Sequence, residues 1–258
     1  MSPPPTLRSL LGPCVLESVR TLWFQNESDE SKLMLPTGDL AKQWFRSDRE
    51  FDKVCLDAFG EQLEYIQSSK ATATDILAAA APSSALDWLS LVLLLDQLPR
   101  NCYRGNDAKV VFAVFDPIAL DITLQAIKVG IPQAPEIKYN MGYRMWFYLP
   151  LQHSEDQRIQ AMSMKENEGI FTDMQTLMNS PDSSVAEDKN LERRRALLLA
   201  GKEAVSSWER NLLDFARIHK VIIDQFGRYP HRNKALGRES TDAEVKYLAD
   251  GGETFGSG

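Results

Sequence analysis

Hydrophobic residues recur at helical spacing along most of the chain, and polar capping signals mark where the helices begin. Ser47-Asp48-Arg49-Glu50 has the form of a capping box, in which a serine oxygen and a glutamate each satisfy a backbone donor. Apolar side chains then follow at Phe51, Cys55, Phe59 and Leu63. Because a spacing of four residues places side chains on one helix face, the pattern predicts an amphipathic helix.

Two further capping boxes open helices in the second half of the chain. Ser154-Glu155-Asp156-Gln157 predicts a helix that runs to about Met178, and Thr241-Asp242-Ala243-Glu244 predicts a short helix near the end. Between them, Pro181-Asp182-Ser183-Ser184 predicts a loop inside a polar insert at about residues 179–188.

Two prolines set the predicted limits of the apolar helices in the middle of the chain. Ser84 caps a helix that is apolar on nearly all sides, so we expect this helix to be central. Pro99 disfavours helical geometry in the residue before it, which predicts a helix end near Gln97. Asp116-Pro117 has the form of an N-cap followed by proline at the first helical position, and Gly130 marks the end.

A long helical pattern extends from about Val185 to Gln225, with a break at Gly201. One face of it carries Val205, Trp208, Leu212, Ala216, His219, Ile223 and Phe226. His219 is therefore predicted to point inward. Since no run of four to eight β-branched residues alternates strictly with polar ones, the fold class is predicted to be all-α with little or no sheet.

Composition adds the expectation of one compact domain. The 258 residues contain 43% hydrophobic and 25% charged residues, which is ordinary globular usage. We expect a single domain over residues 1–258, with loose ends at about 1–6 and 251–258. The net charge of −7 disfavours non-specific binding to nucleic acid, because that binding depends on basic residues that neutralise phosphates.

The cysteines and the apolar runs bear on localisation. Cys14, Cys55 and Cys102 are odd in number and widely separated, so we expect free thiols in a reducing compartment. The apolar run Leu89 to Leu95 is far shorter than a membrane helix requires, so we expect a cytoplasmic protein with no membrane partner. No phosphate loop, nucleophile elbow or dinucleotide fingerprint is present, and we predict no cofactor.

Three polar segments carry a resemblance to a known family. They are Leu95-Asp96-Gln97-Leu98-Pro99-Arg100-Asn101, Leu149-Pro150-Leu151-Gln152-His153-Ser154-Glu155, and Phe226-Gly227-Arg228-Tyr229-Pro230-His231-Arg232-Asn233 with Leu236-Gly237-Arg238. These segments resemble the signatures of domain-of-unknown-function family 924, and the similarity extends from Trp23-Phe24 to Thr241 and Glu244. The resemblance implies an all-α fold similar to a tetratricopeptide-like helical superhelix, and it implies no particular reaction.

The three histidines of the chain, His153, His219 and His231, fall in or just before these segments. Histidine can act as acid, base or metal ligand near neutral pH. None of the pairs has the i, i+4 spacing of a helical zinc motif, so we predict no metal. His153 or His231 is the candidate general acid or base, with Glu155 as its orienting carboxylate.

Basic residues are concentrated between Arg217 and Arg238. This segment contains Arg217, Lys220, Arg228, Arg232, Lys234 and Arg238. Its single acidic residue is Asp224, in a chain that is acidic overall. Such a concentration requires either a bound anion or buried carboxylates as partners.

Two hypotheses meet this requirement. In the first, the basic and amide side chains form a pocket for a small anionic or polar organic ligand. The candidate ligand-binding residues are Arg100, Asn101, Arg228, Arg232, Asn233 and His219. In the second, the arginines pair internally with Asp96, Glu155 and Glu239, and the protein is a helical-repeat-like scaffold that binds a peptide or protein. We favour the pocket, because polar groups rich in arginine and histidine are rarely buried without function.

Overall fold

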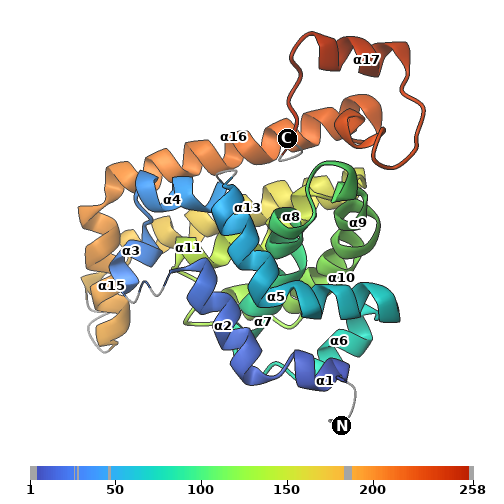
Figure 1. The fold of residues 1–258 in the computed structure, drawn as a ribbon. Coiled ribbons are helices and arrows are strands. Elements are labelled where there is room, and N and C mark those ends of the chain that lie inside the picture. Colours follow the sequence, from blue (N-terminus) through green and yellow to red (C-terminus); the bar gives the residue numbers. More distant parts are fainter. Residues whose placement is uncertain (1–4, 26, 28, 46–47, 183–187, 256–258) are drawn as a thin grey trace.

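The computed structural model describes residues 5–25, 27, 29–45, 48–182 and 188–255 (Figure 1). The first half contains α1 (Leu7–Leu10), α2 (Pro13–Trp23), α3 (Glu30–Met34), α4 (Gly38–Phe45), α5 (Arg49–Ser69), α6 (Ala73–Ala80), α7 (Ala85–Val92), α8 (Leu98–Cys102), α9 (Ala108–Val110) and α10 (Asp116–Lys128). The second half contains α11 (Met141–Arg144), α12 (Leu149–Gln152), α13 (Gln157–Met178), α15 (Lys189–Ala200), α16 (Lys202–Phe226) and α17 (Asp242–Ala249).

Short segments of other helix types link these helices. The π-helical segments are η1 (Leu93–Gln97) and η3 (Val111–Phe115), and the 3-10 turns are η2 (Gly105–Asp107), η4 (Ile131–Gln133), η5 (Met145–Phe147) and η6 (Pro230–Arg232). Within the ranges described, no residue is in a β-strand, so the all-α prediction is confirmed. The superhelical arrangement implied by the family resemblance stays a prediction.

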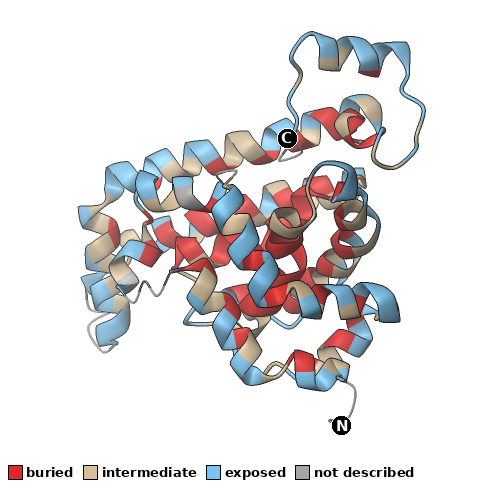
Figure 2. Cartoon of the chain, viewed as in Figure 1, coloured by how far each residue is buried: buried red, intermediate tan, exposed pale blue. Residues whose placement is uncertain are grey.

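The helices surround an apolar centre. The helix α16 runs along one side of the molecule with α13 packed against it, while α5 packs against α8 (Figure 1). Buried residues gather around α7, α8 and α10 (Figure 2). The helix predicted to be central is therefore in the core, with every residue from Leu89 to Leu95 buried. All three cysteines are free, as predicted.

An aromatic cluster joins the N-terminal helices to this centre. The Trp146 ring lies edge-on to Trp23 at 5.1 Å and to Trp44 at 5.3 Å between ring centroids. Phe24 also lies edge-on to Trp44 at 5.9 Å. Edge-to-face packing suits the charge distribution of aromatic rings and adds to the free energy gained by burial.

The predicted helix end near Gln97 is wrong, because the helical path continues through Pro99 into α8. Proline lacks an N–H, and its ring clashes with the carbonyl four residues earlier in a regular α-helix. The π-helical segment η1 removes this conflict, since the backbone N–H of Leu98 bonds to the carbonyl of Leu93, five residues back. The wider turn leaves room for the proline ring.

The same arrangement occurs before Pro117. The backbone N–H of Asp116 bonds to the carbonyl of Val111, again five residues back. Asp116 is therefore inside a continuous helical path and caps nothing, contrary to the N-cap prediction. The predicted end of this helix is confirmed, because Gly130 follows α10 with a φ of +80°.

The capping signals located the helices correctly but not every cap. Thr241 forms the predicted capping box with Glu244. Asp156 caps α13 in place of Ser154, and Asp48 caps α5; Ser47 lies outside the described residues. The break at Gly201 is confirmed, since α15 ends and α16 begins there.

Two further expectations concern the polar insert and the membrane. Residues 183–187 of the predicted insert lie outside the described part of the chain.

Among described helices, one run, Gly105–Lys128, is long and apolar enough by length and composition to cross a membrane, and core helices of soluble proteins pass the same test. Cytoplasmic localisation stays a prediction.

Substitutions at a buried and at an exposed leucine test which residues form the core. Leu94 is fully buried and Leu56 is 48% exposed. We expect Leu94→Ala to lower the free energy of unfolding by about 2–5 kcal/mol, because it leaves a cavity in the core. The matched variant Leu56→Ala should change it by less than about 0.5 kcal/mol. Urea unfolding measures both, and equal losses would contradict the described core.

Candidate functional site

Residues from all three family-like segments meet at one cavity of about 320 Å³. Arg100 and Asn101 reach it from α8, His153 from the end of α12, and Arg232 from η6. Further walls come from Trp44, Phe45, Arg104, Phe215, His219 and Phe255. The convergence that the pocket hypothesis requires is present in the structure.

A buried ion-pair cluster forms one side of the cavity. Nη2 of Arg100 lies 2.5 Å from Oδ1 of Asp116 and 3.4 Å from Oδ1 of Asp96. Asp96 is fully buried, and Asp116 is 8% exposed. Because a buried carboxylate is stable only when it is paired, Arg100 stabilises both aspartates inside the protein, and for Asp116 it shares this role with Arg232.

His153 is oriented by the same cluster. Its Nδ1 lies 2.7 Å from Oδ1 of Asp96. Burial lowers the pKa of His153 and the charge of Arg100 lowers it further, and the opposing effect of Asp96 is smaller. Burial by itself raises the pKa of Asp96, but His153 and Arg100 outweigh it and hold that pKa below its ordinary value. The imidazole is therefore neutral at pH 7, with its proton on Nδ1 and a lone pair on Nε2.

Several polar atoms of the residues that line the cavity have no hydrogen-bond partner among the described residues, including the buried Nε of Arg100 and the buried Nε2 of His219. Nη1 of Arg100, Nη1 of Arg104 and Nε2 of His153 also lack a partner there. Arg104 uses its other two nitrogens on Asp52, at 2.5 and 2.7 Å. The Nη1 donors of Arg100 and Arg104 and the Nε2 acceptor of His153 thus belong to residues that line a single cavity.

Arg232 fixes the geometry of this wall. Its Nη1 donates to the backbone carbonyl of His153 at 3.0 Å and lies 3.2 Å from Oδ2 of Asp116. The guanidinium carbon also lies over the rings of Phe112 and Tyr229, at 4.6 and 4.5 Å from their centroids. A planar cation that packs on two rings and bonds at its edge has little freedom, so Arg232 positions His153.

The end of the described chain closes another wall. The ring of Phe255 stacks on His219 with centroids 3.5 Å apart and an angle of 14°. It also contacts Phe215 at 5.7 Å, so this part of the predicted loose end is packed. Nδ1 of His219 is hydrogen-bonded to the backbone carbonyl of Phe215 at 2.9 Å, while its Nε2 is buried without a partner in the described structure.

Four candidates lie outside the walls of the cavity. Arg228 forms a two-bond ion pair with Glu244, at 2.6 and 2.8 Å, and Asn233 donates to Ser240 at 3.1 Å. His231 is largely enclosed, and both of its nitrogens lack partners within the described ranges.

Glu155 is the fourth, and its predicted role needs correction. It accepts from Arg238 at 2.7 and 3.1 Å and from the backbone N–H of Tyr229 at 2.8 Å. Asp96, not Glu155, is the carboxylate that orients His153. Glu155 instead pairs with Arg238 and Tyr229, and these contacts connect the residues just before α13 to the segment after α16.

Sequence reasoning did not identify Asp116, Arg104 and Phe255 as site residues, and it named Asp96 only as an ion-pair partner. A signal exists for Asp96, since an acidic residue inside a strongly apolar helix must have a partner, and Arg100 follows four residues later. No pattern in the sequence indicates that Asp116 or Phe255 reaches this cavity.

The acidic side of the cluster also has the composition of a cation site. Ligand atoms of Asp96, Asp116 and His153 lie within 4.8 Å of one another. The guanidinium of Arg100 already contacts both carboxylates, however, and a second cation would be repelled by it. These residues fit a metal ion poorly, so the prediction of no metal stands as a prediction.

The buried histidines predict how stability depends on pH. Burial lowers the pKa of His219 and of His231 to about 3, against about 6.5 in the unfolded chain. Well above pH 6.5 each histidine is neutral in both the folded and the unfolded chain, so its protonation does not affect the free energy of unfolding. As the pH falls from 6.5 towards 3, the unfolded chain binds protons that the folded chain does not, so stability falls by up to about 1.4 kcal/mol per pH unit for each histidine.

The variant His219→Phe should lose one histidine's share of this slope, because phenylalanine keeps the stack on Phe255 and cannot bind a proton. Urea unfolding between pH 7 and pH 4.5 measures the slope. An unchanged slope would show that His219 titrates normally in the folded protein.

Comparison with known proteins gives a family and a fold. A family model described as "Bacterial protein of unknown function (DUF924)" matches residues 19–252. The chain is similar to the solved structure of a protein of unknown function from Agrobacterium tumefaciens, with 26% sequence identity, a TM-score of 0.59, and 92% of this chain and 98% of that chain covered. Among curated proteins no sequence matches. Because the family model spans most of its length, the chain belongs to the DUF924 family of bacterial proteins of unknown function.

Proposed function

We propose that this protein binds a small organic carboxylate in the cavity between α8, α12 and η6, and that His153 acts on the bound ligand as a general base. The observation that carries this proposal is that Nη1 of Arg100, Nη1 of Arg104 and Nε2 of His153, on residues of its walls, have no hydrogen-bond partner among the described residues. Two guanidinium donors beside a neutral imidazole can hold a carboxylate next to a proton acceptor.

The charge of the walls favours a monoanion. Arg100, Arg104 and Arg232 contribute three positive charges, Asp52, Asp96 and Asp116 balance them, and the exposed Glu253, which also lines the cavity, adds a negative charge. A dianion such as phosphate would therefore lack a net counter-charge, whereas a carboxylate can use the free donors in a partly desolvated site. The volume of about 320 Å³ suits a small molecule.

The Asp96–His153 pair supports proton transfer as the chemistry. The carboxylate keeps the Nδ1 proton in place and would stabilise the imidazolium formed when Nε2 accepts a proton. Arg232 holds the backbone of His153, so the ring has a fixed position. A proton on the ligand or on an adjacent water is the expected target.

A protein-binding scaffold is the second candidate. The ion pairs Arg228–Glu244 and Arg238–Glu155 favour it, because they match the structural role that this hypothesis gives to the arginines. These pairs lie outside the cavity walls and are compatible with a ligand site formed by Arg100 and Arg104.

Ligand binding can be tested with the variant Arg104→Gln. We expect carboxylates of two to four carbons to bind by calorimetry, and the variant to weaken binding at least about tenfold through loss of a charged donor. Arg217→Gln is the matched control, since it breaks an exposed ion pair with Asp214 away from the cavity and should leave affinity unchanged. Equal weakening in both variants, or no binding to the unaltered protein, would contradict the proposal.

The role of Asp96 can be tested separately with Asp96→Asn. Because the Asp96 carboxylate raises the pKa of His153, its removal should lower that pKa still further and make Nε2 a weaker base. An NMR titration of the His153 ring should show the change, and Asp57→Asn, an exposed aspartate on α5, is the control. A His153 titration that is the same in both variants would refute the pairing.

A further inference from the structure

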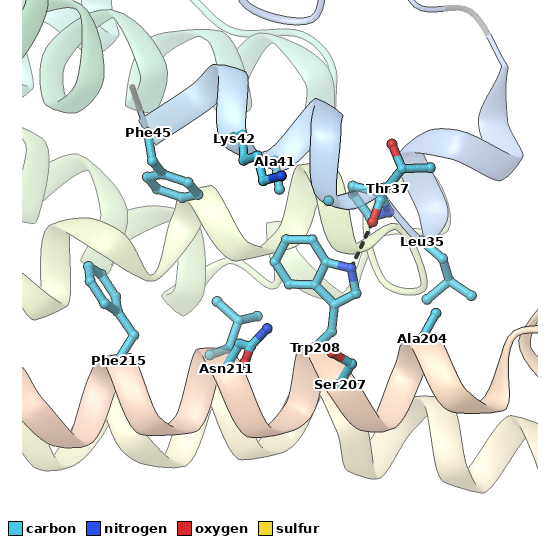
Figure 3. A pocket seen from close by; sticks show the side chains of 13 residues that line it. Leu35, Thr37, Ala41, Lys42, Phe45, Ala204, Ser207, Trp208, Asn211 and Phe215 are labelled. Carbon is cyan, nitrogen blue, oxygen red and sulfur yellow. Dashed lines mark hydrogen bonds between the residues drawn. The ribbon is translucent and has the colours of Figure 1, made fainter. Parts of the chain in front are cut away.

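A second cavity, of about 580 Å³, lies between α4 and α16 (Figure 3). Most of its wall is apolar, with contributions from Leu35, Ala41, Phe45, Ala204, Trp208 and Phe215. The one polar atom of the Trp208 ring is already used, since its Nε1 donates to the carbonyl of Pro36 at 2.9 Å. Trp208 therefore offers this space only an apolar surface.

The apolar cavity adjoins the polar cavity of the proposed carboxylate site. Phe45 and Phe215 line both of them. The two rings stand opposite each other at one end of the apolar cavity, Phe45 on α4 and Phe215 on α16 (Figure 3). The two cavities are therefore neighbours that share these two rings as lining.

Phe45 is exposed to an extent that is unusual for a phenylalanine next to a buried core. It is 51% exposed, although it stacks on Trp146 at 5.6 Å. An apolar ligand that passed between Phe45 and Phe215 would cover this surface and gain the free energy of its removal from water.

We infer that the ligand is an amphiphilic monocarboxylate, with its carboxylate at Arg100 and Arg104 and its hydrocarbon chain lying between Phe45 and Phe215 against Trp208. This inference rests on the proposed function and adds the class of ligand to it. The free donors lie on the walls of one cavity and the apolar surface lies in the next, an order that matches a charged head and an apolar tail.

A series of linear saturated carboxylates from four to ten carbons tests the inference by calorimetry. We expect each added methylene to tighten binding by about three- to fourfold until the apolar cavity is filled. The alcohol of the same chain length should bind at least tenfold more weakly, because it cannot accept charge-assisted hydrogen bonds from the two arginines.

The variant Ala204→Trp fills the apolar cavity from an exposed position on α16, where folding should tolerate it. It should abolish the dependence on chain length and leave the affinity for the four-carbon acid unchanged. Ala58→Trp places the same ring on an exposed position of α5 that neither cavity includes, and it should bind the whole series like the unaltered protein.

The outcomes separate this inference from the proposed function. Short carboxylates that bind with no gain from chain length would overturn the inference alone. Chain-length dependence that survives in Ala204→Trp would place the tail elsewhere and also overturn it. If no carboxylate of any length binds, the proposed function itself fails, and an apolar peptide or a second copy of the chain becomes the candidate for the space beside Trp208.

Discussion

The contact of Arg100 with two buried carboxylates is the interaction on which the site depends. Through Asp116 it ties α8 to the start of α10, and through Asp96 it reaches His153. Removal of the guanidinium would leave Asp96 buried without a cationic partner and Asp116 with Arg232 alone, which costs roughly several kcal/mol. The ionisation of Asp96 and the link between two core helices therefore depend on Arg100, while Asp96 and Arg232 together position His153.

The backbone makes this contact possible through two π-helical turns. Both η1 and η3 end directly before a helical segment with a proline in its first two positions, and both bring an aspartate to the same guanidinium. Proline would break a regular helix at these points, whereas the wider π turn keeps the helical path continuous. The π-helical turns therefore allow Pro99 and Pro117 to lie within continuous helical paths in the buried core.

The basic residues divide into two groups with different surroundings. Arg228, Arg232 and Arg238 fasten the segment after α16 to α17, η3 and α13 through ion pairs and ring contacts. Arg100 and Arg104 use part of their donors on aspartates; in the described structure Nε and Nη1 of Arg100 and Nη1 of Arg104 have no partner. The sequence hypotheses of a ligand pocket and of internal ion pairs therefore apply to different arginines, and the two roles support each other because the fastened segment orients His153.

The sequence by itself determined the helices and the family. Capping residues, helical spacing and Gly201 located α5, α13, α16 and α17, since these signals act over one or two turns of the chain. The predicted pairing of Glu155 with His153 failed because distant partners decide it: Glu155 is held by Arg238 and Tyr229, and His153 pairs with Asp96. Only the tertiary structure decided that Asp96 orients His153, that Phe255 covers His219, and that Phe45 and Phe215 line both cavities. The physical reason is that these residues are between 36 and 170 positions apart in sequence, so their proximity depends on how whole helices pack and not on any neighbouring residue.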